Sequence, residues 1–429
     1  MKVLGAIGIA FIFLGRNGKF WEAEVLNIVK EQRVRKVATV ALIVLGICGG
    51  PGAAWSETQK TDAETLRAAT LLFRHSIVSP KYTAPKAKAE WPMGLRQLTA
   101  LGIREMYQTG QALRDKYVEE LGFISGSYMP REVYVRASNT DRSLQSAQLL
   151  MLGLFPLGTG PDPAVYDTSL EAAPAPGQAF NPVPVHSVAL ENDWVLRPYT
   201  GKANCKKYKN FVKSFPKTEL YQKQGRKYQD LLKLVSSATG MYEGEKTSKI
   251  LYSINEIYEV LSASVQHNFS IPPEISDEHL QKIKELSDWN YHNQFLGKDV
   301  GKLMGGGFLA ELAANFAAHT KDDSRARKFS LYAGHQRTVL GVEAALGIET
   351  ARTTGPLFSG RVPPPATYYA FELHEPTKGS FEVRLKFNSH GEEQVISVPG
   401  CGGPTCAFDS FAKLTAEMVP RDWRAACKG

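Results

Sequence analysis

The stretch that decides the fold is residues 71–80, whose sequence is LLFRHSIVSP. Its apolar part, Leu71 to Phe73, predicts a buried strand that ends at Arg74 and His75. In open α/β sheets, ligands bind just beyond the carboxyl ends of the strands. We therefore expect Arg74 and His75 to lie in a loop that faces a ligand.

Two distant stretches repeat this pattern of an apolar strand followed by a cation or an imidazole. Residues 133–136 read VYVR and end at Arg136, with Arg142 shortly after, and residues 329–335 read FSLYAGH and end at His335. Three such strands in one sheet would bring two imidazoles and two guanidiniums together at one edge. Because guanidiniums bind phosphoryl oxygens and an imidazole is a nucleophile, the pattern predicts a phosphate site with a nucleophile in it.

These motifs resemble those of the histidine acid phosphatases, a branch of the histidine phosphatase superfamily, over about residues 71–427. The resemblance implies an α/β fold, in which helices flank a central mixed, mostly parallel sheet. Besides the stretches above, it is carried by WPMGLRQLTALG at residues 91–102, RASNTDRSLQSA at 136–147, PVHSV at 184–188 and LYAGHQRTV at 331–339.

The resemblance implies a two-step hydrolysis of phosphomonoesters through a phosphohistidine on His75. Such chemistry needs a neutral imidazole with one free nitrogen and several cations around the phosphoryl oxygens. By their places in the motifs, Arg74, Arg136 and His335 are the expected phosphate-binding residues. We expect neither a metal ion nor another cofactor.

Two positions depart from the family pattern. After the Arg-His pair the family carries Gly, any residue and then Arg, whereas this chain has Ser76, Ile77 and Val78. After its second His the family carries an acid, usually Asp, that protonates the leaving oxygen, whereas this chain has Gln336. Loss of a charge-assisted contact typically costs about 1.5–3 kcal/mol, and loss of a general acid costs about 10²–10⁴-fold in rate.

Two functions therefore remain open. One is a weak acid phosphatase, and the other is a catalytically inactive relative that binds a phosphorylated ligand. The carboxylates Glu372 and Glu375 in the string FELHE at residues 371–375 could supply the missing proton. Because they lie on a late strand, we interpret them instead as solvent-exposed charges at the end of that strand. We likewise interpret His186 and His319 as histidines without a role in the reaction.

The middle of the chain differs in character from its flanks. Residues 201–324 show apolar side chains at helical spacing and almost no strand signal, so we expect a helical cap inserted into an α/β core of residues 55–200 and 325–429. Within this core we expect strands at residues 132–135, 185–188, 328–333, 367–374 and 380–387, and helices at 94–121, 141–154, 338–346 and 407–418.

Residues 1–54 are expected to form a leader with a signal peptide. Basic residues precede the apolar run Val37 to Cys48, and small residues follow it before Trp55. The run is shorter than the roughly 20 apolar residues of a membrane span, although a signal anchor remains an alternative. We expect entry into the secretory pathway and a secreted, lysosomal or endosomal protein. A second apolar run ahead of the signal leaves open whether residues 1–32 are a genuine leader.

Four cysteines remain after the predicted signal peptide, and an even number in a secreted chain implies two disulfides with three possible connectivities. Cys401 and Cys406 bracket a turn tight enough for a bridge. Cys205 and Cys427 are then left for each other, and the family resemblance supports the same pairing. The sequon at Asn268 predicts a glycosylation site in this compartment.

Of the formal net charge of +8, residues 1–54 carry +4, and the remaining charge of about +4 is mild. No run of Lys and Arg is present of the kind that tracks a nucleic-acid backbone, so a nucleic-acid partner is not expected. The expected partner is a phosphomonoester substrate or a phosphorylated ligand. A homodimer is one candidate assembly.

Overall fold

The computed structural model describes residues 61–87, 89–160, 181–200, 205–348 and 362–428. The predicted leader and signal peptide at residues 1–54 lie outside the described residues. Among the helices that are described, none combines the length and the apolar composition needed to cross a membrane.

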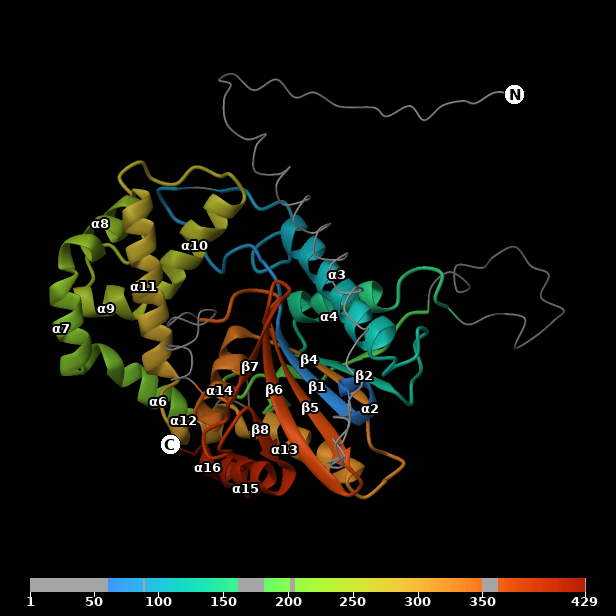
Figure 1. Ribbon diagram of the computed structural model, residues 1–429. Coiled ribbons are helices and arrows are strands. Elements are labelled where there is room, and N and C mark those ends of the chain that lie inside the picture. Colours follow the sequence, from blue (N-terminus) through green and yellow to red (C-terminus); the bar gives the residue numbers. More distant parts are fainter. Residues whose placement is uncertain (1–60, 88, 161–180, 201–204, 349–361, 429) are drawn as a thin grey trace, which may run out of the picture. The chain divides into compact units, whose positions relative to one another are not determined.

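A single mixed sheet organises the described chain, with strand order β3-β2-β4-β1-β5-β6-β7 and β8 paired to β6 (Figure 1). Pairings among the first four strands of this order are parallel, and all the others are antiparallel. The predicted mixed sheet is confirmed, but its antiparallel half is larger than expected. The strands are β1 (Leu66–Arg74), β2 (Val133–Ala137), β3 (Val185–His186), β4 (Phe329–Gly334), β5 (Tyr368–Thr377), β6 (Ser380–Ser389), β7 (Glu392–Ile396) and β8 (Thr405–Ala407).

The parallel strands β1, β2 and β4 end level with one another. Phe73 of β1 and Ala137 of β2 are both register partners of Ala333 in β4. Every residue of β4 is buried, as expected for a parallel strand that is covered on both faces. The residues that follow these three strands therefore emerge together at one edge of the sheet.

Helices cover both faces of the sheet. On one face, α3 (Ala100–Arg114) and α4 (Asp141–Leu154) pack an apolar cluster against β1, β2 and β4. These two helices approach closely because Gly110 and Gly153 face each other, and a Cβ on either glycine would collide with the backbone of the other helix.

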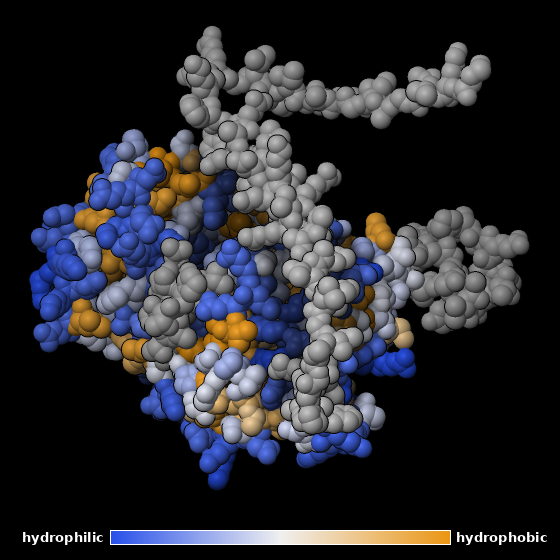
Figure 2. Space-filling model, viewed as in Figure 1, coloured by the Kyte–Doolittle hydropathy of each residue, from blue (hydrophilic) through white to orange (hydrophobic). Residues whose placement is uncertain are grey.

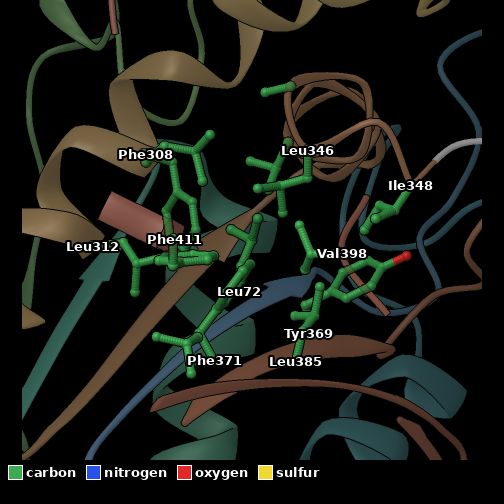
Figure 3. Close-up of a cluster of buried hydrophobic side chains, with 14 of the residues drawn as sticks. Leu72, Phe308, Leu312, Leu346, Ile348, Tyr369, Phe371, Leu385, Val398 and Phe411 are labelled. Atoms are coloured by element: carbon green, nitrogen blue, oxygen red, sulfur yellow. The ribbon is translucent and has the colours of Figure 1, made fainter. Parts of the chain in front are cut away.

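On the other face, α13 (Gly306–His319), α14 (Gln336–Leu346) and α15 (Phe408–Met418) contribute to a second cluster, with helical side chains packed against strand residues such as Leu72 and Phe371 (Figure 3). The remaining elements of the described core are the short helices α2 (Asp62–Thr65), η1 (Asp115–Glu120), η3 (Leu190–Asn192) and α16 (Trp423–Ala426).

Between β3 and β4 the described chain is helical. Its helices α6 to α11 gather beside the sheet and share an apolar cluster of their own, whereas α13 packs on the sheet (Figure 1). On the face shown in Figure 2, hydrophilic residues dominate the surface over α7 and α8. The cap with boundaries at residues 201 and 324 stays a prediction. The helices are α6 (Lys206–Ser214), η5 (Phe215–Lys217), α7 (Glu219–Lys227), α8 (Gln229–Thr239), α9 (Thr247–Tyr252), α10 (Ile254–Gln266), α11 (Asp277–Gln294) and α12 (Lys298–Met304).

The helix predicted at residues 94–121 is the largest local error. The α-helix begins only at Ala100, with Thr99 as its N-cap, and continues from Asp115 as the π-helical η1. Ser79 accounts for the late start, because its backbone exchanges hydrogen bonds with Arg96 and Gln97 and holds that segment as a loop. The edge strands β7 and β8 were not predicted, since both are short and β7 carries charges rather than an alternating apolar pattern.

Both predicted disulfides are present. Cys205 bonds to Cys427 across 222 residues, and Cys401 bonds to Cys406. The longer bridge joins the residue before α6 to the residue after α16. Asn268 is exposed in the turn after α10, so the sequon is accessible, and its glycosylation stays a prediction.

Candidate active site

Two buried histidines meet at the carboxyl edge of the parallel strands. His75 follows β1 and His335 follows β4, and their ring centroids lie 5.1 Å apart in an edge-to-face arrangement. The sheet continues to this point, because the His75 backbone N–H donates to the Gly334 carbonyl. The expected convergence of the two imidazoles is therefore found.

The hydrogen bonds of His75 identify its nucleophilic nitrogen. Nδ1 lies 2.9 Å from the Ser76 carbonyl oxygen, which can only accept, so Nδ1 carries the proton. Nε2 then keeps its lone pair, and Arg142 Nε donates to it over 3.2 Å. Burial, followed by the charges of Arg142 and Arg74, lowers the pKa of His75 well below its ordinary value. His75 is thus held neutral, as a nucleophile must be.

His335 is held by hydrogen bonds to its ring and to its backbone N–H. Its Nε2 lies 2.6 Å from the hydroxyl of Ser138, which follows β2, and its backbone N–H donates to Thr338 Oγ1 at the start of α14. Burial lowers the pKa of His335 well below its ordinary value, and neighbouring His75 and Arg142 act in the same direction. A neutral imidazole here offers one ring nitrogen as a hydrogen-bond donor and the other as an acceptor.

Arg74 is the last residue of β1 and is partly buried. Its Nη1 donates to the Pro363 carbonyl over 2.6 Å, while its Nε is buried and has no partner among the described residues. Burial lowers the pKa of Arg74, an effect opposed by Tyr291 and Glu259. Its positive charge is close enough to His75 to contribute to the lowered pKa of the imidazole.

Arg136 does not join this group. Its Nη1 donates to Glu311 on α13 over 2.5 Å, and its Nη2 donates to buried Asp193 over 2.9 Å. Although burial lowers it, these two carboxylates raise the pKa of Arg136 overall. The charge of Arg136 is therefore already paired, and the phosphate-binding role predicted for it stays a prediction.

Arg142 and Arg197 are the cations that the sequence reasoning did not assign. Arg142 lies in the first turn of α4, whose N-terminus starts at Asp141, and a cation at a helix start directly after a strand end was an available signal. Arg197 lies in an irregular segment after η3, where no local pattern marks it.

The two departures from the expected motif are also located. Val78 forms an isolated β-bridge with Leu98, and Ser76 donates its hydroxyl hydrogen bond to Glu105. Gln336 is the first residue of α14, directly after His335. A carboxamide at this place has no acidic proton to donate.

A partly buried carboxyl group that interacts with the cationic end is Glu259 of α10. It accepts the Lys81 backbone N–H over 2.9 Å. Burial raises the pKa of Glu259, although Lys81 and Arg74 oppose the increase. Glu259 therefore takes up a proton more readily than an ordinary glutamate and interacts electrostatically with both Arg74 and Arg142.

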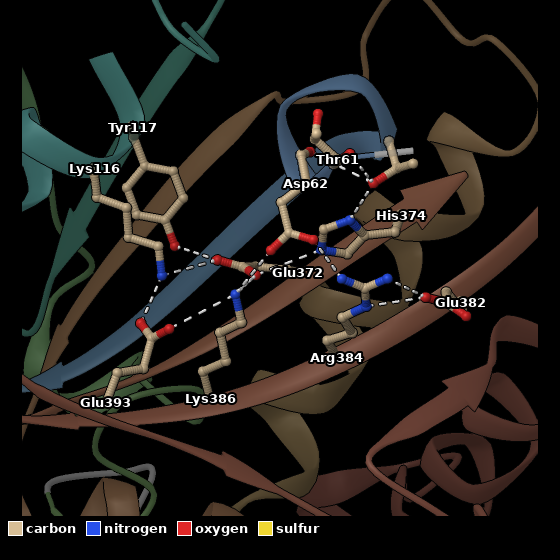
Figure 4. Close-up of polar contacts among 11 residues, drawn as sticks. Thr61, Asp62, Lys116, Tyr117, Glu372, His374, Glu382, Arg384, Lys386 and Glu393 are labelled. Carbon is tan, nitrogen blue, oxygen red and sulfur yellow. Dashed lines mark hydrogen bonds and ion pairs between the residues drawn. The ribbon is translucent and has the colours of Figure 1, made fainter. Parts of the chain in front are cut away.

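Glu372 belongs to a different part of the sheet, shown in Figure 4. It pairs with Ala69 of β1, five residues before Arg74, which is about 17 Å along a strand. Its carboxylate contacts Lys386 at 2.7 Å, Tyr117 at 2.7 Å and Lys116 at 3.4 Å. Although burial acts against it, His374 and the two lysines lower the pKa of Glu372, so it has no proton to give at the active site.

This group also has ligand types that suit a metal ion, since atoms of Asp62, Glu372 and His374 lie within 4.8 Å of one another. However, Lys386 and Arg384 already pair with its carboxylates. The protein's own cations therefore occupy the place that a metal ion would take.

Comparisons with known proteins agree with this geometry. The family model for the histidine phosphatase superfamily, branch 2, matches residues 52–388. The chain is 30% identical to human lysosomal acid phosphatase over 376 residues, covering 86% of this chain and 81% of the human protein. It is 28% identical to human prostatic acid phosphatase, covering 85% of this chain and 88% of that protein.

Solved structures share the fold. The phytase from Citrobacter braakii matches with a TM-score of 0.61 at 15% identity, covering 84% of this chain and 99% of the phytase. The phytase of Klebsiella sp. ASR1 matches with a TM-score of 0.59 at 17% identity, covering 83% and 96%. With two histidines at the strand ends and a family match over most of its length, this chain belongs to branch 2 of the histidine phosphatase superfamily.

Proposed function

We propose that this protein hydrolyses phosphomonoesters through a phosphohistidine on His75. The observation that carries the proposal is the Nε2 lone pair of His75, which the Ser76 carbonyl holds in the correct tautomer and which faces the guanidinium of Arg142. Membership of the superfamily and similarity to acid phosphatases support the same reaction.

In the first step, the hydrogen bond of the Arg142 N–H moves from His75 Nε2 to a phosphoryl oxygen, and Nε2 attacks phosphorus and forms a P–N bond while the bond to the leaving oxygen breaks. The Nδ1 proton stays on the ring, where the Ser76 carbonyl stabilises the imidazolium character of the phosphohistidine. In the second step, water attacks phosphorus, the P–N bond breaks, and phosphate and neutral His75 are released. Arg74 and Arg142 stabilise the charge on the phosphoryl oxygens in both steps.

Gln336 restricts which substrates react. Without an acid at this position, the leaving oxygen departs with its negative charge. Aryl oxides, whose conjugate acids have a pKa near 10 or lower, tolerate this far better than the strongly basic alkoxides. We therefore propose weak activity with a preference for aryl over alkyl phosphates.

The test is hydrolysis of nitrophenyl phosphate at acid pH by the purified protein. His75→Ala is expected to reduce kcat/KM by about 10⁴-fold or more, because nucleophile and its activation are lost together. His279→Ala, at the start of α11 in the helical segment, is the matched histidine control and should retain wild-type activity. Equal activity of the two variants would refute the mechanism.

The second candidate is a phosphate-binding protein without turnover. Val78 and Gln336 favour it, because one removes a cation and the other an acid from the expected pattern. The second candidate is supported if no substrate is hydrolysed while phosphate or vanadate still raises Tm, because a ligand that binds only the folded state stabilises it.

We also propose that the chain enters the secretory pathway and reaches a secreted or lysosomal location. The relatives' designation as lysosomal and prostatic acid phosphatases, the two disulfides and the exposed sequon at Asn268 support this. Removal of the predicted signal peptide can be checked by N-terminal sequencing of protein from a secreting eukaryotic host, which should begin near Trp55.

A further inference from the structure

Arg197 is tied to the active site through its backbone. Its N–H donates to the Asp193 carbonyl over 3.1 Å, and the preceding residue, Leu196, donates its own N–H to Asp193 Oδ1 over 3.1 Å. The Leu196 carbonyl accepts from Thr338 Oγ1 over 2.6 Å, and the same hydroxyl accepts the N–H of His335. A single side chain therefore links the segment that carries Arg197 to the second histidine.

The anchor of this segment explains why Arg136 is paired. Asp193 is fully buried, and its Oδ1 accepts hydrogen bonds from both Arg136 Nη2 and the Leu196 N–H. Arg136 is therefore a positioning residue that holds the 193–197 segment against the sheet. Through Asp193 and Leu196, Arg136 therefore helps to position Arg197.

The guanidinium of Arg197 has a buried donor with no acceptor. Its Nε is inaccessible to solvent and makes no hydrogen bond among the described residues. Its Cζ lies 5.5 Å from the ring centroid of Tyr199, and Arg337 lies over the same ring at 5.6 Å. The ring orients both guanidiniums but accepts no conventional hydrogen bond on its face. Buried donors of this kind are normally satisfied, so an acceptor is expected to come from a ligand.

The positive charge of Arg197 affects the pKa values of the active-site residues. After burial, it is the first of the charges that lower the pKa of Arg142, and it is one of the cations that lower the pKa of His75 and His335. These effects agree with the hydrogen bonds that join the Arg197 segment to His335 through Thr338. Such a group of cations is costly unless an anion lies between them.

We propose that Arg197 binds an oxygen of the phosphoryl group and takes over from the cation that the family pattern places where this chain has Val78. The proposal rests on the proposed function for the identity of the ligand. Arg197 reaches the site from the side of His335 and α14, whereas position 78 lies on the loop after β1. The phosphate clamp is therefore rearranged rather than simply lost.

The test measures binding of inorganic phosphate and vanadate to the full folded chain by calorimetry and by the shift in Tm. Arg197→Leu is expected to weaken binding by about 10–100-fold, as for loss of a charge-assisted contact. Arg197→Lys should retain part of the affinity, because it keeps the charge without the planar fork. Arg325→Leu, which removes an exposed arginine that pairs with Asp323, is the matched control and should bind as the wild type does.

A double variant separates binding from a structural role. Val78→Arg combined with Arg197→Leu should recover most of the phosphate affinity, which repair of packing alone would not do. If Arg197→Leu fails to fold, Arg197→Gln keeps a polar side chain with a hydrogen-bond donor while it removes the charge, and the same 10–100-fold loss is expected. In variants that turn over substrate, loss of this cation should also shift the acid limb of kcat/KM to higher pH, because the pKa of His75 rises.

The outcomes distinguish this inference from the proposed function. Phosphate binding by Arg197→Leu that equals that of Arg325→Leu overturns the inference, whatever the activity. A wild-type protein that binds phosphate through Arg197 but hydrolyses nothing supports the inference and refutes turnover. A wild-type protein that binds neither phosphate nor vanadate refutes both.

Discussion

The two ends of β1 carry charges in opposite arrangements. At the amino end, Glu372 lies among Lys116, Lys386, His374 and Tyr117, so that a buried negative charge is surrounded by donors. At the carboxyl end, cations gather around two neutral imidazoles, and two of their buried Nε atoms have no partner among the described residues. The paired charges at the amino end stabilise the folded protein, whereas the cations at the carboxyl end are left for an anionic ligand.

The largest expected effect comes from adding a carboxyl group to the cationic end. Gln336→Asp should raise kcat/KM for glycerol phosphate by about 10²–10⁴-fold, because the alkoxide could then leave as an alcohol. Nitrophenyl phosphate should gain far less, since its leaving group needs no proton. The measurement is kcat/KM for both substrates beside Gln336→Asn.

An equal gain on both substrates would mean that the new carboxyl group acts on the phosphoryl group and not on the leaving oxygen. Efficient hydrolysis of alkyl phosphates by the wild type would mean that another acid already serves, and Glu259 would be the first to test by Glu259→Gln.

The next effect concerns the paired end. Glu372→Gln should lower the free energy of unfolding by about 3 kcal/mol, because it removes the buried carboxylate that pairs with Lys386 and Lys116. Urea denaturation measures this change, while kcat/KM should stay within about twofold. Glu393→Gln removes a partner of the same lysines that is more exposed, and it should cost less than about 1 kcal/mol. A large loss of activity in Glu372→Gln would contradict the assignment of stability to one end of β1 and of activity to the other.

A smaller effect is expected when the cationic end receives one more cation. Val78→Arg should raise kcat/KM about tenfold for aryl and alkyl phosphates alike, because a phosphate clamp does not sense the leaving group. Without ligand the same variant should have a lower Tm, and phosphate should restore it. Val78→Leu controls for side-chain size. A change confined to one substrate class would contradict the role of a clamp.

The smallest expected effect is a difference in the pH range over which each end of β1 loses its contribution to the free energy of unfolding. The folded-state pKa values of His75 and His335 lie below their ordinary value of 6.5, so the unfolded chain binds protons first as the pH falls. Their contribution to stability is complete above about pH 6.5 and is lost below it, at about 1 kcal/mol per histidine between pH 7 and pH 5.5. Glu372, whose pKa is lowered, loses its contribution only below its ordinary value of 4.5.

The measurement is the free energy of unfolding against pH, without phosphate, for the wild type and His75→Ala. The variant should lose less stability between pH 7 and pH 5.5. Identical curves would show that His75 is not held neutral by its surroundings.

How far the sequence predicts the site depends on where each residue sits. His75 and His335 follow buried apolar strands, so a local pattern is enough to place them together. Arg136 satisfied the same pattern, yet it points to carboxylates on other elements, which no local pattern reveals. Arg197 reaches the site through a contact between Leu196 and Thr338, which are 142 residues apart, so only the folded chain shows it.

The fold shows the same division. The helix at residues 141–154 follows from periodicity and is found with the predicted bounds, and the strands around β1 are found within a few residues of theirs. The late start of α3 depends on hydrogen bonds from Ser79, and the network around Glu372 joins η1, β5, β6 and β7. Both depend on partners that are distant in sequence.

The bond between Cys205 and Cys427 has a consequence for a chain that is cut. His75, Arg142 and Arg197 precede this loop and His335 lies inside it, so one cleavage anywhere between the two cysteines leaves both imidazoles on covalently joined fragments. Both cysteines are buried, at 0% and 5% exposure, so a reductant reaches the bond only when the protein opens. A protein cleaved once in this loop would therefore run as one species on a denaturing gel until it is reduced. Proteolytic cleavage in this region would leave the active-site residues covalently joined.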